Sequence, residues 1–248
     1  MTEYESWTIA SWGRTGSFAT TNMLLWHMRQ QFPQAMAIYN ALETRTSVLP
    51  IEPYTVYHCH SLAQLNLLPK VEKCGVVLSV RQPSISAISC LVAKELGTWH
   101  MHNPNYINEL KKRLKDPSHS MNHDYYKSSI KEYDTWLKSN DKKFNITIDM
   151  IKEYRTYACQ YNQTAVEMLN SISHRVKYVE YDKWQGDLNM LAHLIGIAPV
   201  SELYMIRQKD LRHWSHHLND ADTICTWVES MTHEDCKLLA GWENQLYN

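Results

Sequence analysis

The order of patterns along the chain predicts an α/β fold, with a central parallel sheet and helices on both of its faces. Short β-prone runs alternate with segments in which apolar residues recur every three or four positions. Residues 75–81 include a continuous apolar run, as expected of a parallel strand that is buried on both faces. At 248 residues the chain is long enough for one such domain, and we expect residues 1–248 to form it.

Four segments are predicted to be strands, with helices between and after them. The strand segments are residues 7–12, 55–59, 75–81 and 176–181. The helical segments are residues 83–96, 105–116, 125–138, 148–173, 187–195 and 232–247, in addition to a helix that follows the first strand. Thr232 and Asp235 have the spacing of a capping box at the start of the last helix. Residues 98–173 are expected to form a helical insertion, which would serve as a lid or an acceptor pocket over the strand ends.

The composition favours a soluble globular protein without a nucleic-acid partner. Hydrophobic residues make up 44% of the chain, charged residues make up 21%, and the formal net charge is -1. Because the net charge is so small, the protein as a whole has no positive electrostatic field that would attract nucleic acid. Any anion site therefore has to be formed by local groups. The six cysteines include no CxxC pair and are expected to be buried, reduced thiols. We find no signal peptide and no apolar stretch of membrane-spanning length, which predicts a cytoplasmic protein without a membrane span.

A glycine-containing loop follows the first strand and has the sequence GRTGS at residues 13–17. Glycines permit a tight turn in which backbone N–H groups converge, and the helix that follows directs its positive end at the loop. Arg14 adds a fixed charge with several planar donors. Hydroxyl donors are expected from Thr15, Ser17, Thr20 and Thr21. An ordinary strand-to-helix turn is the alternative. Because the Gly-Lys-Ser/Thr ending of nucleoside triphosphatases is missing, we expect nucleotide binding without necessarily any cleavage of a γ-phosphate.

A second anion site is predicted at the end of the third strand segment. Arg81 closes this segment, and Ser89 follows eight residues later in a helix that Pro83 can begin. From these positions the two side chains can converge on one anion through charge-assisted hydrogen bonds. The alternative is an arginine at a strand end that is solvated or ion-paired.

In these features the chain resembles the sulfotransferases that use 3′-phosphoadenosine 5′-phosphosulfate (PAPS) as their donor. Their donor loop has Lys or Arg, then Ser, Thr or Gly, then Gly, then Ser or Thr, which residues 14–17 match. Their second motif is an Arg at a strand end with a Ser eight positions later, as at Arg81 and Ser89. Cytosolic members have a Lys-Thr-His strand end between the two motifs, where this chain has His58-Cys59-His60. Later motifs of the family are similar to Val179-Glu180-Tyr181-Asp182 and, more distantly, to Arg207-Gln208-Lys209 with Trp214.

The resemblance implies a P-loop-like sulfotransferase fold and a set of donor-binding residues. These are Arg14, Thr15, Gly16, Ser17, Phe18, Ala19, Thr20, Arg81, Ser89, Arg207 and Lys209. The loop would hold the 5′-phosphosulfate, while Arg81 and Ser89 would hold the 3′-phosphate. Ala19 stands where cytosolic members have a tryptophan that stacks on the adenine, so Phe18 is expected to supply an aromatic contact instead.

The reaction that the resemblance implies is in-line transfer of a sulfuryl group to a hydroxyl or an amine, without a metal ion. Arg14 would stabilise charge on the leaving phosphate, and His60 would accept the proton of a small-molecule or carbohydrate acceptor. For His60, the alternative is a histidine that is hydrogen-bonded at a strand end. Two other functions stay open, namely a P-loop nucleotide kinase and a catalytically silent nucleotide-binding protein. Neither the acceptor nor the oligomeric state is predicted.

Three further patterns have ordinary structural explanations. His213 and His217 share the i, i+4 spacing of some metal sites, but no carboxylate or thiol completes a recognised ligand pattern. The basic residues within 111–115 could attract an anionic acceptor, although such a run is usually a solvated helix face. The aromatic stripe is predicted to be packing, and it consists of Tyr125, Tyr126, Tyr133 and Trp136.

Overall fold

A computed structural model describes residues 4–39, 52–66, 68, 72–97, 104–138, 141–184, 189–196 and 213–248. Within these residues, five strands form one sheet in the order β2-β3-β1-β4-β5, and all neighbouring strands are parallel. The strands are β1 (Ser6–Ala10), β2 (Met36–Ile38), β3 (Thr55–Cys59), β4 (Cys74–Val80) and β5 (Val176–Glu180). The predicted α/β class with a central parallel sheet is therefore confirmed.

Helices connect the strands and follow the last of them. They are α1 (Ser17–Gln31), α2 (Leu62–Leu65), α3 (Pro83–Leu96), α4 (Pro104–Arg113), α5 (His123–Leu137), α6 (Ile148–Asn170), α7 (Tyr181–Trp184), α8 (Met190–Leu194) and α9 (Ala221–Tyr247). Short 3₁₀ helices span Pro117–Asn122, Ser173–Arg175 and His213–His217. The ends of α3 follow from its sequence. Pro83 occupies a first turn that needs no backbone N–H, and Gly97 ends the helix in the left-handed conformation at a φ of 67°.

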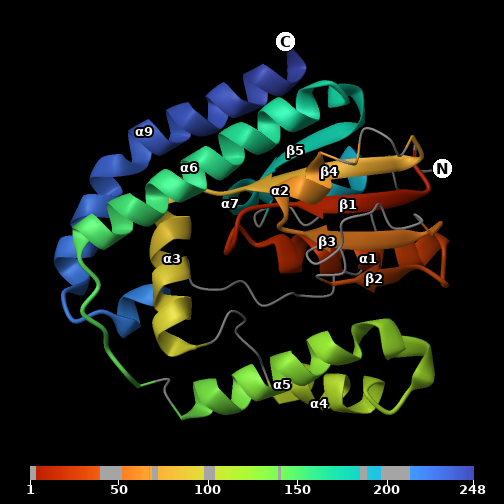
Figure 1. Ribbon diagram of the computed structural model, residues 1–248, viewed down its shortest axis with the longest axis horizontal. Coiled ribbons are helices and arrows are strands. Elements are labelled where there is room, and N and C mark those ends of the chain that lie inside the picture. The colour runs from red at the N-terminus through yellow and green to blue at the C-terminus, as the bar shows by residue number, and fades with distance from the viewer. Residues whose placement is uncertain are drawn as a thin grey trace.

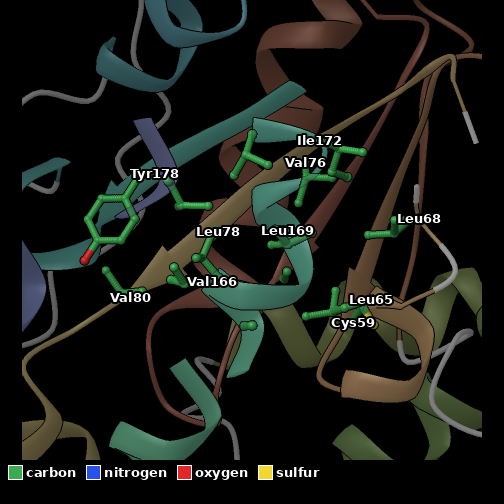
Figure 2. Packing of buried hydrophobic residues seen from close by; sticks show 14 of the residues in the cluster. Cys59, Leu65, Leu68, Val76, Leu78, Val80, Val166, Leu169, Ile172 and Tyr178 are labelled. Atoms are coloured by element: carbon green, nitrogen blue, oxygen red, sulfur yellow. The ribbon is translucent and has the colours of Figure 1, made fainter. Parts of the chain in front are cut away.

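Helices cover both faces of the sheet and make three layers (Figure 1). α1 and α8 pack on one face against a cluster that includes Ile9 and Val77. α6 and α9 lie side by side on the other face, over Val76 and Leu78. Figure 2 shows this second interface, where side chains of α6 lie against those of β4 and β5. Since adjacent residues of a strand point to opposite faces, β4 is buried on both sides, as its apolar run predicts.

The connections make the carboxyl end of β1 a favourable place for a ligand. The connection from β1 to β2 passes β3 and ends at one edge of the sheet. The connections from β3 to β4 and from β4 to β5 run toward the opposite edge. Ligand sites of open parallel sheets lie beyond the carboxyl ends of the strands, at the point where this direction reverses. The loop at residues 11–16, between β1 and α1, lies at that point.

Two elements differ from the sequence-based expectation. The sequence does not predict β2, because three residues are too few to show a strand pattern. The last helix, α9, begins at Ala221 instead of residue 232, so the predicted capping box is wrong. Thr232 lies inside the helix and donates from Oγ1 to the carbonyl oxygen of Val228, and Asp235 is fully buried.

The predicted insertion, residues 98–173, divides into two parts. α6 belongs to the helical layer on the sheet, so this part of the predicted lid is wrong. α4 and α5 pack on each other beyond the β2 edge (Figure 1). Asn122 joins this pair to the edge, because its Nδ2 donates to the carbonyl oxygen of Ala37 at 2.9 Å and its Oδ1 accepts from the N–H of Tyr39 at 3.4 Å. For α4 and α5 the lid role stays a prediction.

Candidate functional site

The loop between β1 and α1 contains two residues with left-handed backbones. Gly16 is the N-cap of α1 and has a φ of 75°, while Arg14 has a φ of 64°. A Cβ atom on Gly16 would lie 1.9 Å from Cδ2 of Tyr181, so both the backbone conformation and the packing require glycine. Left-handed residues within a turn direct backbone N–H groups into a concavity, to which the N-terminus of α1 adds partial positive charge. The backbone here is suited to an anion.

Helix α3 holds the loop from one side. Ser86 Oγ donates to the carbonyl oxygen of Gly13 at 2.9 Å, and Cys90 Sγ donates to the same oxygen at 3.4 Å. Arg14 Nε donates to Ser89 Oγ at 3.0 Å. Ser89 belongs to the predicted second motif and Arg14 to the predicted loop, so the fold brings these two sequence segments into direct contact.

The threonine hydroxyl groups of the loop have internal acceptors. Thr15 Oγ1 donates to the carbonyl oxygen of Trp12 at 2.9 Å, and Thr20 Oγ1 donates to that of Gly16 at 3.1 Å. Both threonines are fully buried, and a hydroxyl group has a single hydrogen to donate. They therefore shape the loop instead of supplying the donors that the sequence suggested.

Arg81 lies at the carboxyl end of β4, as predicted, and is ion-paired. Its Nε donates to both carboxylate oxygens of Asp182, at 3.1 Å and 3.4 Å. The guanidinium also lies over the ring of Tyr181, 5.3 Å from the ring centroid. An ion-paired arginine is one of the alternatives that the sequence allows at this position, and the structure has that arrangement. Burial raises the pKa of Asp182, and the nearby charge of Arg81 opposes that rise.

Burial and like charge both act on the Arg14 guanidinium. Burial lowers the pKa of Arg14, the nearby Cys90 opposes that change, and the positive charge of Arg81 lowers it further. Burial also raises the pKa of the Cys90 thiol to about 12, so this thiol is neutral at physiological pH. The positive charge of Arg81 thus disfavours the charged form of Arg14, an effect that a bound anion would oppose.

His60 is half-buried at the end of β3 and hydrogen-bonded to the loop after β1. Its Nδ1 lies 2.7 Å from the carbonyl oxygen of Ser11 and 3.1 Å from Ser11 Oγ. A carbonyl oxygen only accepts, so Nδ1 carries the hydrogen and Nε2 of the neutral ring is left with a lone pair. This contact is the strand-end hydrogen bond that the alternative interpretation of His60 expects. The other ring nitrogen, Nε2, is the one with which a general base would accept a proton.

His58 lies next to His60 and is more deeply buried. The two rings meet edge to face, with their centroids 4.4 Å apart. His58 Nε2 shares a 2.7 Å hydrogen bond with Oγ of Ser17, the first residue of α1. Both histidines are therefore within the site, and His58 orients the hydroxyl group of Ser17, which the sequence predicts to bind the donor.

Aromatic side chains join the loop to the α4 and α5 pair. Phe18 has its ring centroid 5.2 Å from that of Tyr39 and 5.9 Å from that of Tyr125. Tyr39 and Tyr125 stack at 4.6 Å. Phe18, which is expected to contact the adenine, thus lies against the insertion. Within the aromatic stripe, the packing prediction holds for Tyr126, which is buried among the apolar residues between α4 and α5.

Several predicted residues lie away from this site or outside the described part of the chain. Arg207 and Lys209 lie outside the described residues. Trp214 is buried against α3. His217 donates from Nδ1 to the carbonyl oxygen of Lys142 at 3.2 Å, which is a structural role. Within the described ranges, no three His, Cys, Asp or Glu side chains gather closely enough to bind a metal ion.

Three residues that form or support the site are not predicted as functional. Tyr181 contacts Gly16 and Arg81, and Asp182 pairs with Arg81. The similarity of residues 179–182 to a family motif was the available signal, although it gave no partners. Asp235 was also missed. It accepts from the N–H of Ser84 at the start of α3 and binds Arg155 Nε at 2.9 Å, and so anchors the helix that holds the loop.

No family model matches this chain, and neither the curated proteins nor the solved structures gave a match. Over the described ranges, every helix is too short or too polar to cross a membrane. What supports a function is thus the arrangement of the residues themselves.

Proposed function

We propose that this protein is a cytoplasmic, PAPS-dependent sulfotransferase whose acceptor is a hydroxyl or an amine of a small molecule or carbohydrate. The observation that carries the proposal is the 3.0 Å hydrogen bond from Arg14 Nε to Ser89 Oγ. It joins two segments, 75 residues apart in the sequence, that resemble the two donor-binding motifs of this family. A donor with phosphate groups at both its 5′ and 3′ ends needs two anion sites within the length of one nucleotide, and this contact fits that requirement.

The residues divide into two groups by the part of the donor that each would hold. The backbone N–H groups of residues 13–17 and the Arg14 guanidinium take the 5′ side, where negative charge increases as the sulfuryl group leaves. Ser89 and Arg81 take the 3′-phosphate. The donor supplies an activated sulfuryl group, so the main tasks of the protein are to position the acceptor and to neutralise this charge.

His60 is proposed to accept the acceptor's proton. Its Nδ1 lies 2.7 Å from the carbonyl oxygen of Ser11 and so carries the hydrogen, which leaves the lone pair of the neutral ring on Nε2, where a proton would be accepted. We expect His60→Ala to lower turnover by on the order of 10²- to 10⁴-fold, because general-base catalysis contributes about that much. Binding of the product 3′-phosphoadenosine 5′-phosphate (PAP) should be unchanged, and both can be measured by a radiolabelled transfer assay and by calorimetry. Near wild-type turnover in His60→Ala would remove this role.

Thermal unfolding with two ligands tests the proposal against the other functions. PAP at about 100 times its dissociation constant should add roughly 2.7 kcal/mol of stability and raise the melting temperature by about 5 to 10 °C. ATP with magnesium should have little effect, since Gly16 is followed by Ser17 and not by the lysine of a triphosphate loop. A shift with ATP alone would favour a kinase. A shift with PAP but no transfer of radiolabelled sulfate to any of a panel of acceptors would favour a silent nucleotide-binding protein.

A further inference from the structure

The anion that Arg81 binds in this structure is a side chain of the protein itself. Asp182 follows the carboxyl end of β5, which is paired with β4 so that Glu180 lies beside Val80. The Asp182 carboxylate therefore meets Arg81, which directly follows β4, and both of its oxygens lie within 3.4 Å of Nε. The Arg81 side chain is 7% exposed, whereas that of Asp182 is 23% exposed.

Carboxylate and phosphate groups are recognised by arginine in the same way, through charge-assisted hydrogen bonds to the planar guanidinium. The negative charge of Asp182 lies against Arg81, where it repels any second anion that approaches the same group. A phosphate therefore binds Arg81 most strongly once this carboxylate has moved away or has lost its charge.

We propose that Asp182 is a built-in competitor for the anion site of Arg81, and that the 3′-phosphate of the nucleotide displaces its carboxylate when the nucleotide binds. This inference rests on the proposed function, because it takes the 3′-phosphate to be the ligand of Arg81. Asp182 then determines specificity. A dianionic phosphate competes successfully with one carboxylate, whereas a nucleotide without a 3′-phosphate leaves the ion pair intact.

Two observations explain why the carboxylate can leave while the arginine stays. Burial raises the pKa of Asp182 in spite of Arg81, so the surroundings favour the ionised carboxylate less than water does. Asp182 is also the more exposed of the two partners. Arg81 in contrast lies over the ring of Tyr181, which packs on Gly16 of the loop. The ring keeps the guanidinium beside the loop after the carboxylate has moved.

The test compares two charge-removing variants at the end of the same strand, with two nucleotides. Asp182→Asn removes the competitor. Glu180→Gln is the matched control, because Glu180 pairs with Lys183 at 2.6 Å. The dissociation constants of PAP and of adenosine 5′-monophosphate (AMP), which lacks the 3′-phosphate, are measured by calorimetry. We expect Asp182→Asn to bind PAP at least about tenfold more tightly than the wild type, with AMP affinity unchanged. Glu180→Gln should resemble the wild type with both nucleotides.

A second variant, Asp182→Ser, should show the same gain, so the test does not depend on the folding of one protein. Weaker or unchanged binding of PAP in the folded variants would overturn the inference, because Asp182 would then orient Arg81 or have no effect. An equal gain for AMP would also overturn it, since the effect would not be specific to the 3′-phosphate. If the wild type binds no PAP, the proposed function fails. Inorganic phosphate then tests the remaining part of the inference, that Asp182 competes for the anion site of Arg81. This part stands if the two Asp182 variants bind phosphate more tightly than the wild type, and it fails if they do not.

Discussion

The two arginines of the candidate site differ in the partners that the fold gives them. Arg14 donates from Nε to a neutral hydroxyl group, that of Ser89, and burial lowers its pKa. Arg81 donates from Nε to the carboxylate of Asp182. An anion that approaches Arg81 has to compete with this carboxylate, whereas the Ser89 hydroxyl group carries no charge. In the proposed function, Arg14 is the first anchor for the nucleotide, and Arg81 is a second anchor whose availability depends on Asp182.

The largest expected effect comes from the support of the first anchor. Asp235 accepts from the first turn of α3, which carries Ser89, and binds Arg155 at 2.8 Å. Asp235 is fully buried, so Asp235→Asn leaves Arg155 without this charge partner and should lower the free energy of unfolding by about 3 to 5 kcal/mol. Urea unfolding measures the loss. Glu234→Gln is the control: its carboxylate binds the same arginine but is 59% exposed, so its loss should cost no more than about 1 kcal/mol. Equal losses in both variants would show that α3 is not anchored in this way.

A smaller effect is expected where the two anchors are joined. Gly16→Ala forces a left-handed alanine and directs its Cβ into the ring of Tyr181, the same ring that lies under Arg81. We expect a loss of about 1 to 3 kcal/mol in the free energy of unfolding, measured in urea. Gly241→Ala is the control, since no heavy atom lies within 4 Å of its added Cβ and it lies inside α9. That variant should gain roughly 0.5 to 1 kcal/mol. A tolerated Gly16→Ala would mean that Tyr181 does not connect the anchors.

The smallest effect is a pH dependence that belongs to the second anchor alone. The pKa of Asp182 is raised in the folded state, so the folded protein holds this proton at pH values where the unfolded chain has released it. The stability that this proton contributes is present below the ordinary carboxyl pKa, and it is lost as the pH rises through the folded pKa. Relative to Asp182→Asn, the wild type should therefore lose stability as the pH increases above about 4. Urea unfolding at a series of pH values checks this sign, and a relative gain would contradict it.

Local patterns predicted the elements whose signals are local. Pro83 and Gly97 define the ends of α3, and the glycine-containing loop after β1 has the conformation expected of an anion-binding turn. β2 was missed because a strand of three residues at a sheet edge has no readable pattern. The start of α9 was misplaced because Thr232 and Asp235 have a capping spacing inside a helix, where each has another partner.

The partners of the site residues could not be predicted from the sequence. Arg81 and Asp182 are 101 residues apart, and they meet only because β4 and β5 pair in one register. The sequence placed a positive charge at the correct strand end, but it could not show that a carboxylate faces it. The threonine hydroxyl groups of the loop were likewise identified as donors, and only the fold shows that their hydrogens point to backbone carbonyl oxygens.

The central claim is that Arg14 and Arg81 bind opposite phosphates of one nucleotide. Calorimetric titration of PAP and AMP into Arg14→Ala and Arg81→Ala tests it most directly, because the two ligands differ only in the 3′-phosphate. We predict that Arg14→Ala weakens the binding of both nucleotides, whereas Arg81→Ala weakens PAP binding until it equals AMP binding. If Arg81→Ala weakens both nucleotides equally, or if PAP and AMP bind the wild type with the same affinity, the two arginines do not share one ligand and the claim is wrong.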